Sequence, residues 1–180
     1  MNQEELLILV DENDNATGHL NKMEVHLSGL LHRAFSVFIF NSKGQLLLQQ
    51  RAEHKYHSGG LWTNTCCSHP NAGETLDNAV KRRLKQEMGI EFNDSKFIFN
   101  FRYKVDFIGG LTENEIDHVY FGVTDKLPFP NQQEVKNWKY VDMYDLQLQL
   151  LLNPERYTEW LKICFDKVLF HFEKLIAQKN

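Results

Sequence analysis

The stretch that decides the fold runs from residue 68 to residue 90 and reads SHPNAGETLDNAVKRRLKQEMGI. A polar, glycine-containing loop comes first, and apolar side chains then recur every four positions, at Leu76, Val80, Leu84 and Met88. That period places them on one face of a helix. Thr75 can cap the start of this helix, and Gly89 can end it. The stretch therefore predicts a helix entered from a loop, a place that commonly holds a phosphate group or its metal.

The polar face of the predicted helix carries charged side chains at regular spacing. Arg83 and Glu87 are four residues apart and share one face, and Arg82 and Gln86 form a second such pair. Judged from the helix alone, a solvated face with surface ion pairs is the favoured explanation of this pattern. The loop that precedes the helix favours the alternative, in which these side chains contribute to an anion or metal site.

Strands are predicted on both sides of the helix. Residues 6–20, LLILVDENDNATGHL, indicate a strand, a turn rich in Asn and Asp, and a short second strand. Residues 34–51 indicate a hairpin, with AFSVFIF and QLLLQQR as its strands and NSKG as its turn. Further strands are expected over 96–107 and 114–124.

The chain from Pro154 onward has the pattern of one long amphipathic helix. Its apolar stripe comprises Tyr157, Leu161, Phe165, Val168, Phe172 and Ile176. Strands before and after a middle helix, followed by a helical end, predict a mixed α/β protein. A length of 180 residues fits a single domain over residues 1–180.

Composition and charge exclude several classes of protein. The formal net charge is -4, so bulk attraction to nucleic acid or to an anionic membrane is not expected. The first ten residues, MNQEELLILV, are acidic and hold a short apolar run, which predicts neither a signal peptide nor a membrane span. Only 3 cysteines are present, so a disulfide framework is not expected and a cytoplasmic location is predicted.

Two adjacent cysteines occur in residues 62–70, WTNTCCSHP. On an extended segment Cys66 and Cys67 point to opposite faces, so one can be a core residue while the other faces a cleft. Cys67 and His69 then share a face, and a thiol beside a metal-bound imidazole can act as proton donor, base or nucleophile. The alternative is that both cysteines are small buried apolar residues, the commoner fate of cysteine.

Two glutamates lie two residues apart in residues 112–118, TENEIDH. On a strand Glu113 and Glu115 face the same way and repel each other, unless a cation lies between them or one is protonated. Three histidines, His26, His32 and His69, could join them around an octahedral Mn²⁺ or Mg²⁺, or a less regular Zn²⁺. Their spacing alone does not establish this, and an exposed strand face remains the alternative.

Basic residues with anion-binding potential are scattered along the chain, at Lys22, Arg51, Lys55, Arg82 and Arg83. They are either ordinary surface charges or, gathered at one cleft, a binding site for a diphosphate.

Residues 68–90 resemble the Nudix box, whose usual form is GX5EX7REUXEEXGU, with U an aliphatic residue. The positions in register are Glu74, Arg82, Leu84, Glu87, Gly89 and Ile90. Ser68 replaces the first Gly, Arg83 replaces the Glu after Arg, and Gln86 replaces the first of the paired Glu. The two lost carboxylates normally help to hold the metals of Nudix hydrolases, so the departures argue against ordinary hydrolysis.

Together with WTNTCCSHP, LLHRAFSVFIFN, RRL, FRYK and TENEID, these departures make the chain similar to type 1 isopentenyl diphosphate isomerases. The likeness runs from about Leu6 to Trp160. It implies a Nudix-like mixed sheet sandwiched between helices, with a long C-terminal helix. It also implies an enzyme that interconverts isopentenyl and dimethylallyl diphosphate by protonation and deprotonation.

The resemblance also implies the site residues. Cys67 and Glu115 correspond to the catalytic cysteine and glutamate, and Tyr103 to the tyrosine that assists the glutamate. The implied ligands of a Mn²⁺, Mg²⁺ or Zn²⁺ ion are His26, His32, His69, Glu113 and Glu115. Glu87 corresponds to the residue that contacts a second, substrate-bound Mg²⁺. The implied substrate contacts are Lys22, Arg51, Lys55, Arg83 and Trp160. The expected partner is this small-molecule substrate, without nucleic acid or membrane, and the expected state is a monomer.

Two other functions compete with the isomerase. A metal-dependent Nudix hydrolase of a nucleotide or prenyl diphosphate would need the carboxylates that Arg83 and Gln86 replace, and it has no obvious use for Cys67. A catalytically inactive Nudix domain serving as a binding module would not need Cys67, Glu113 or Glu115. The sequence therefore favours the isomerase.

Overall fold

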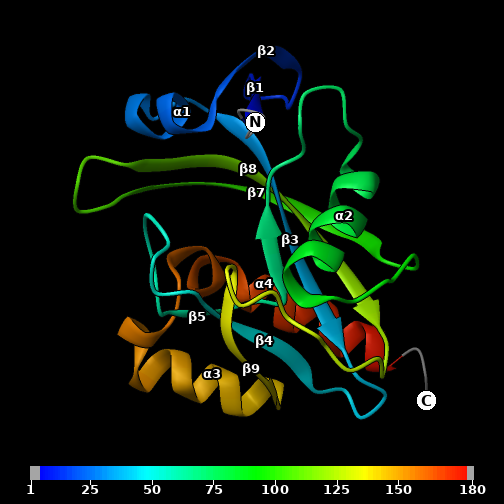
Figure 1. The fold of residues 1–180 in the computed structure, drawn as a ribbon. Coiled ribbons are helices and arrows are strands. Elements are labelled where there is room, and N and C mark those ends of the chain that lie inside the picture. Colours follow the sequence, from blue (N-terminus) through cyan, green and yellow to red (C-terminus); the bar gives the residue numbers. More distant parts are fainter. Residues whose placement is uncertain (1–4, 178–180) are drawn as a thin grey trace.

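The computed structural model describes residues 5–177 and contains one mixed sheet of nine strands with helices on both of its faces (Figure 1). The strands are β1 (Leu6–Val10), β2 (Ala16–Asn21), β3 (His32–Phe40), β4 (Leu46–Arg51), β5 (Trp62–Thr63), β6 (Cys66–Ser68), β7 (Lys96–Asp106), β8 (Thr112–Val123) and β9 (Val135–Val141). The helices are α1 (Lys22–Ser28), α2 (Leu76–Met88), α3 (Met143–Leu152), the short 3-10 helix η1 (Pro154–Arg156) and α4 (Glu159–Ala177). The predicted mixed α/β class is confirmed.

The helix predicted from the quoted stretch is confirmed as α2. The Thr75 hydroxyl accepts a hydrogen bond from the Asn78 backbone N–H at 3.3 Å, and Gly89 ends the helix with a left-handed φ of 66°. The apolar side chains of α2 are buried with those of β3 and β6, including Val37, Ile39 and Cys66. Helix α2 therefore covers one face of the sheet, and α4 packs against the other face in a second apolar cluster.

The hairpin predicted over 34–51 is only partly correct. Its strands and its turn form as β3 and β4, but they pair with each other only at Phe40 and Leu46. Residues 62–68 insert between them, because β5 pairs with β4 and β6 pairs with β3. At the insertion the Thr65 hydroxyl accepts from the Ile39 backbone N–H at 2.9 Å and donates to the Leu47 carbonyl at 2.6 Å. One threonine thus satisfies backbone groups on both separated strands.

The prediction of one long helix from Pro154 is also only partly correct. The chain forms η1, becomes extended at Tyr157, and starts α4 at Glu159. The break is stabilised by the bridge of Tyr157 to Trp62 and by the Thr158 backbone N–H, which donates to the Trp62 carbonyl at 3.0 Å. The predicted stripe is buried from Tyr157 to Phe172, and only Ile176 at its end is exposed, at 41%. Helices α1 and α3 and strand β9 were not predicted.

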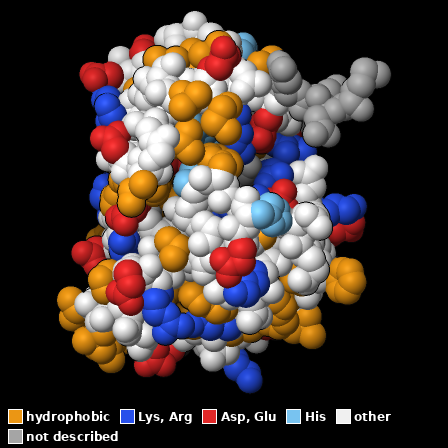
Figure 2. Space-filling model, turned by 60° about the vertical axis from the view of Figure 1, so that its left-hand side comes forward, with side chains coloured by type: hydrophobic (Ala, Val, Ile, Leu, Met, Phe, Trp, Pro, Cys, Tyr) orange, Lys and Arg blue, Asp and Glu red, His pale blue; other side chains and the backbone are white. Residues whose placement is uncertain are grey.

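The surface agrees with the modest net charge. Acidic and basic side chains are interspersed on the face shown in Figure 2, with apolar side chains between them. Within residues 5–177, no helix is long and apolar enough to cross a membrane. The opening MNQE of the acidic N-terminal run lies outside the described residues.

Candidate metal centre and catalytic cleft

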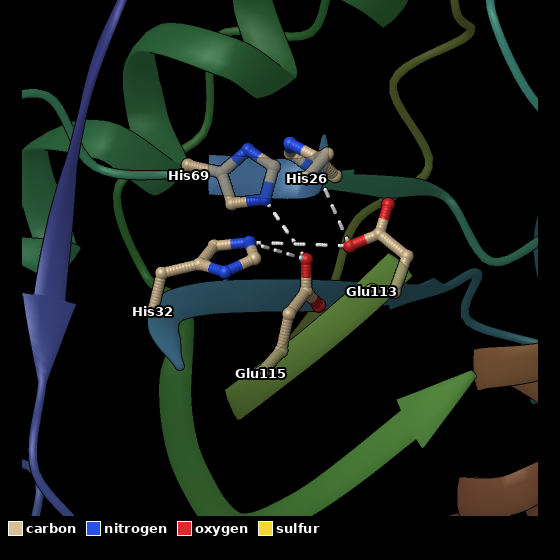
Figure 3. Close-up of side chains that lie close together, drawn as sticks. All are labelled: His26, His32, His69, Glu113 and Glu115. Atoms are coloured by element: carbon tan, nitrogen blue, oxygen red, sulfur yellow. Dashed lines mark hydrogen bonds and ion pairs between the residues drawn. The ribbon is translucent and has the colours of Figure 1, made fainter. Parts of the chain in front are cut away.

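Five side chains from four parts of the chain converge in the interior (Figure 3). They are His26 of α1, His32 at the start of β3, His69 directly after β6, and Glu113 and Glu115 of β8. Each offers one ligand atom, these atoms lie within 4.8 Å of one another, and all five residues are buried. The convergence that residue spacing could not establish is present in the structure.

The histidine rings are oriented by backbone carbonyls. His26 Nδ1 lies 2.6 Å from the Lys22 carbonyl oxygen, and His32 Nδ1 lies 2.9 Å from the Leu30 carbonyl oxygen. A carbonyl oxygen only accepts, so each Nδ1 carries the proton and each Nε2 presents a lone pair to the cluster. Both Nε2 atoms are buried without a hydrogen-bond partner among the described residues. Unpartnered, correctly oriented imidazole nitrogens fit a bound metal ion.

The two glutamates point the same way from β8, as the alternation of a strand predicts. Between them Asn114 turns to the other side and donates to the Gly29 carbonyl at 2.9 Å. Burial and the neighbouring Glu113 raise the pKa of Glu115 to about 7. Against the cost of burial, the contacts with His26 and His57 hold the pKa of Glu113 well below its usual range. Three imidazoles and two carboxylates suit a divalent cation that accepts nitrogen and oxygen ligands.

Tyr103 is placed against Glu115 by the pairing of β7 with β8. The two residues are directly opposite each other in the antiparallel register, and the Tyr103 hydroxyl donates to Glu115 Oε2 at 2.7 Å. The other oxygen, Oε1, lies 2.9 Å from His69 Nε2 and 3.3 Å from His32 Nε2. Glu115 therefore faces the histidine cluster with one oxygen and the tyrosine with the other.

The two cysteines have the separate environments that alternation predicts. Cys66 is fully buried in the apolar cluster beneath α2. Cys67 is half-buried on the opposite face and lines a cleft together with Glu115, Tyr103 and Trp160. An Arg51 guanidinium nitrogen lies 4.0 Å from Cys67 Sγ. Burial, partly offset by Arg51, raises the pKa of the Cys67 thiol to about 12.

Trp160 forms a wall of this cleft and is itself 4% exposed. Its indole N–H donates to Asn64 Oδ1 at 3.2 Å, and the Asn64 amide donates to the Cys66 carbonyl at 2.8 Å. The Thr63 hydroxyl also donates to Asn64 Oδ1, at 2.8 Å. One buried asparagine therefore connects the tryptophan with the backbone beside Cys67. The cleft has a volume of about 580 Å³, including the space at its open mouth.

The predicted substrate-binding cations line the same cleft. Lys22, Arg51, Lys55 and Arg83 are all among its lining residues. Lys22 pairs with Glu5 at 2.9 Å, and Lys55 forms an ion pair with Glu134. Arg83 lies 3.6 Å from the same Glu134 carboxylate. Four cations at a cleft floored by buried histidines form a suitable site for an anion such as a diphosphate.

Some polar residues of α2 line the cleft, and others stabilise the loop beside it. Arg82 lies outside the cleft lining and makes a bidentate pair with Glu74, at 2.8 and 2.7 Å. It also donates to the His69 carbonyl at 3.3 Å, which ties α2 to the loop that carries a candidate ligand. Glu87 is buried at the cleft and accepts from Arg83 at 2.6 Å and from Gln49 at 2.8 Å. The solvated-face alternative is therefore wrong for Glu87.

Several residues at the site were not predicted from the sequence, among them His57, Gln49, Asn64 and Glu134. Nothing in their spacing sets them apart from other polar residues. Gln49 and Asn64 occur in strand-like or extended segments, where burial of an amide is not visible in the sequence. Glu134 belongs to a loop far along the chain from the cations it pairs with. Tertiary contacts alone reveal these positions.

Comparisons with known proteins identify the family to which this fold belongs. The model of the NUDIX domain matches residues 30–161, and the chain belongs to the Nudix family. A Deinococcus radiodurans protein of known structure superposes with a TM-score of 0.76 at 20% identity, covering 91% of this chain and 98% of that one. A MutT protein from Methanosarcina mazei superposes with a TM-score of 0.62 at 18% identity, covering 80% and 94% of the two chains. At these identities the two structures support the fold only.

Curated relatives narrow the assignment within the Nudix family. The isopentenyl-diphosphate Delta-isomerase of Pectobacterium atrosepticum is 48% identical over 174 residues, which is 97% of each chain. Isopentenyl-diphosphate Delta-isomerase 2 of Aromatoleum aromaticum is 48% identical over 166 residues, covering 92% of this chain and 87% of that one. The chain is a member of the isopentenyl-diphosphate Delta-isomerase family.

Proposed function

We propose that this protein interconverts isopentenyl and dimethylallyl diphosphate. The observation that carries the proposal is that Cys67 and Glu115 line one cleft whose remaining walls supply Trp160 and four cations. The isomerases that resemble the chain over nearly its full length support the same assignment. A reaction that adds one proton and removes another needs two proton-transfer groups at a single substrate, and this cleft provides them.

The chemistry explains the residue types. Isomerisation adds a proton at the terminal methylene carbon and removes one from the carbon next to the diphosphate-bearing carbon. The double bond shifts by one position, and no other group enters or leaves. A tertiary carbocation is the natural intermediate, so a water molecule in the cleft would capture it. One of Cys67 and Glu115 would donate a proton to the substrate and the other would accept one from it; Glu115 is buried and Cys67 half-buried, which limits access of water.

Tyr103 and Trp160 assist in different ways. The Tyr103 hydroxyl, hydrogen-bonded to Glu115, can hold that carboxylate in place or pass a proton to it. The face of the Trp160 ring can stabilise a nearby cation by about 2 kcal/mol when water is excluded. That is worth roughly a 30-fold change in rate, so the positioned acid and base must supply most of the acceleration.

The diphosphate takes no part in bond breaking. Lys22, Arg51, Lys55 and Arg83 would anchor it, so that the alkene reaches between Cys67 and Glu115. We propose Glu87 as the contact of a Mg²⁺ ion that accompanies the diphosphate. A Mn²⁺, Mg²⁺ or Zn²⁺ ion held by the three histidines and two glutamates would fix the Glu115 carboxylate and neutralise the neighbouring charge of Glu113. We also propose that the enzyme is a single-domain monomer. A cytoplasmic location is proposed as well, in keeping with the three free cysteines.

The proposal is tested by incubating the purified protein with Mg²⁺ and isopentenyl diphosphate, and by analysing both the prenyl diphosphates and the released phosphate. We expect dimethylallyl diphosphate and no increase in orthophosphate or pyrophosphate. Release of either phosphate without isomer would instead establish a Nudix-type diphosphate hydrolase. Arg83 occupies a position where the hydrolase box has a glutamate, and it pairs with Glu87. This replacement favours the first result.

A further inference from the structure

A fourth histidine lies against the candidate metal ligands without being one of the five converging residues. His57 Nε2 is 2.6 Å from Glu113 Oε1, and both side chains are almost fully buried, at 5% and 4% exposure. The other oxygen of the same carboxylate, Oε2, faces His26 Nε2 at 3.3 Å and His32 Nε2 at 3.9 Å. The two oxygens of Glu113 therefore have different neighbours: Oε2 faces the histidine ligands, and Oε1 faces His57.

The hydrogen-bonding surroundings of His57 favour one tautomer. His57 Nδ1 lies 3.3 Å from the Ser58 hydroxyl. A carboxylate oxygen only accepts, so the ring proton belongs on Nε2, the nitrogen that faces Glu113, and the Ser58 hydroxyl can then donate to the unprotonated Nδ1. In that form the His57 Nε2–H lies in close contact with the carboxylate oxygen that the ligand histidines do not use, and it has no other hydrogen-bond partner among the described residues.

Aromatic packing fixes the position of the His57 ring. It is stacked on Phe107, with ring centroids 4.7 Å apart and planes 14° from parallel. The edge of Tyr56 lies against it at 4.5 Å, and Trp160 lies 6.0 Å away. The ring therefore occupies the space between the metal cluster and the tryptophan wall of the cleft.

The loop that carries His57 is closed tightly at its base. The Arg51 backbone N–H donates to the Leu61 carbonyl at 2.9 Å, and the Arg51 guanidinium donates to the His57 carbonyl at 3.3 Å. A Cβ on Gly59 would lie 2.4 Å from the Glu53 carbonyl oxygen, so this close approach requires glycine. A rigid loop of this kind can hold a side chain against a ligand with the accuracy that a metal site needs.

We propose that His57 is a positioning residue for the metal site: its Nε2–H, 2.6 Å from Glu113 Oε1, holds that oxygen and so orients Oε2 toward the ion. Carboxylate ligands are commonly held by such outer partners, and loss of the partner typically costs 10- to 100-fold in metal affinity. The inference rests on the metal site included in the proposed function. It does not depend on which reaction that site serves.

The test is Mn²⁺ binding to the substrate-free protein, measured by titration with electron paramagnetic resonance detection of free Mn²⁺. His57→Ala is expected to weaken binding by about 10- to 100-fold. His57→Gln keeps a side-chain N–H donor of similar reach and is expected to bind within a few-fold of the wild type. The matched control is His54→Ala, because His54 belongs to the same loop and is exposed; its affinity should be unchanged.

Two results would overturn the proposal: wild-type affinity in His57→Ala, or equal losses in His57→Gln and His57→Ala. If His57→Ala does not fold, Ser58→Ala decides, since it removes the hydroxyl that pairs with His57 Nδ1. Weaker Mn²⁺ binding in Ser58→Ala supports the proposal, and an unchanged affinity contradicts it. Because no substrate is present, a failure here is distinguishable from a failure of the isomerase assignment.

Discussion

The Tyr103 hydroxyl donates a 2.7 Å hydrogen bond to Glu115 from the residue directly opposite it on the neighbouring strand. The same glutamate contacts His69 at 2.9 Å through its other oxygen. Because register fixes the first contact and the strand end fixes the second, Glu115 has little freedom to rotate. A carboxylate held in this way is suited to proton transfer at a fixed position in the cleft.

Replacement of Tyr103 by Phe removes this hydrogen bond and little else, because the ring still packs on Phe101. We expect kcat to fall by roughly 100-fold, at the lower end of what a general acid–base group contributes, with little change in KM. The measurement is steady-state isomerase kinetics alongside thermal unfolding. A higher KM with an unchanged kcat would assign Tyr103 to substrate binding instead.

Cys67→Ala and Cys66→Ala should separate the two cysteines. Cys67 lines the cleft, so its loss is expected to reduce kcat by at least about 100-fold while the substrate still binds. Cys66 is fully buried beneath α2, so its loss is expected to cost about 1 kcal/mol of folding stability and to leave most of the activity. Turnover at the wild-type rate in Cys67→Ala would remove this thiol from the mechanism.

Metal removal should destabilise the fold as well as abolish activity. Glu113 and Glu115 are buried side by side, and a cation between them relieves their repulsion. Addition of Mn²⁺ at 100 times its dissociation constant should raise the free energy of unfolding by about 2.7 kcal/mol. Thermal unfolding of the chelator-treated protein, with and without Mn²⁺, measures this effect. If the chelator-treated protein melts at the same temperature with saturating Mn²⁺ as without it, the five residues do not bind the ion.

The Glu74–Arg82 pair should stabilise the loop that carries His69. The pair is bidentate and mostly buried, and charge-assisted hydrogen bonds of this kind contribute about 1.5–3 kcal/mol. Arg82→Lys cannot reproduce the fork, so we expect a loss of folding stability in this range. Chemical denaturation of Arg82→Lys, Glu74→Gln and the double variant gives the coupling energy. Additive losses in the double variant would show that the pair is not coupled.

Local patterns predicted part of this structure because they reflect local physics. The four-residue period with its two caps fixed the limits of α2, and strand alternation separated Cys66 from Cys67 and aligned Glu113 with Glu115. The division of β3 from β4 was not predictable in the same way. It depends on the insertion of residues 62–68, where Thr65 satisfies two strands that are distant in sequence.

The site, like the fold, was predictable only where local patterns or the family resemblance identify its residues. Spacing alone left the histidines and glutamates as candidates, and the resemblance to a family selected the five that the structure brings together. His57 and Glu134 were missed because each acts through a tertiary contact, with Glu113 in one case and Lys55 in the other. The break at Tyr157 was missed because a bridge to Trp62 overrides the helical pattern of the chain end.

The central claim is most directly tested by deuterium incorporation. The protein would be incubated with isopentenyl diphosphate and Mg²⁺ in heavy water, with product followed by ²H and ³¹P nuclear magnetic resonance. The account predicts dimethylallyl diphosphate with deuterium in a methyl group, an intact diphosphate, and no incorporation by Cys67→Ala. Cleavage of the diphosphate, or isomer formed without deuterium, would contradict it.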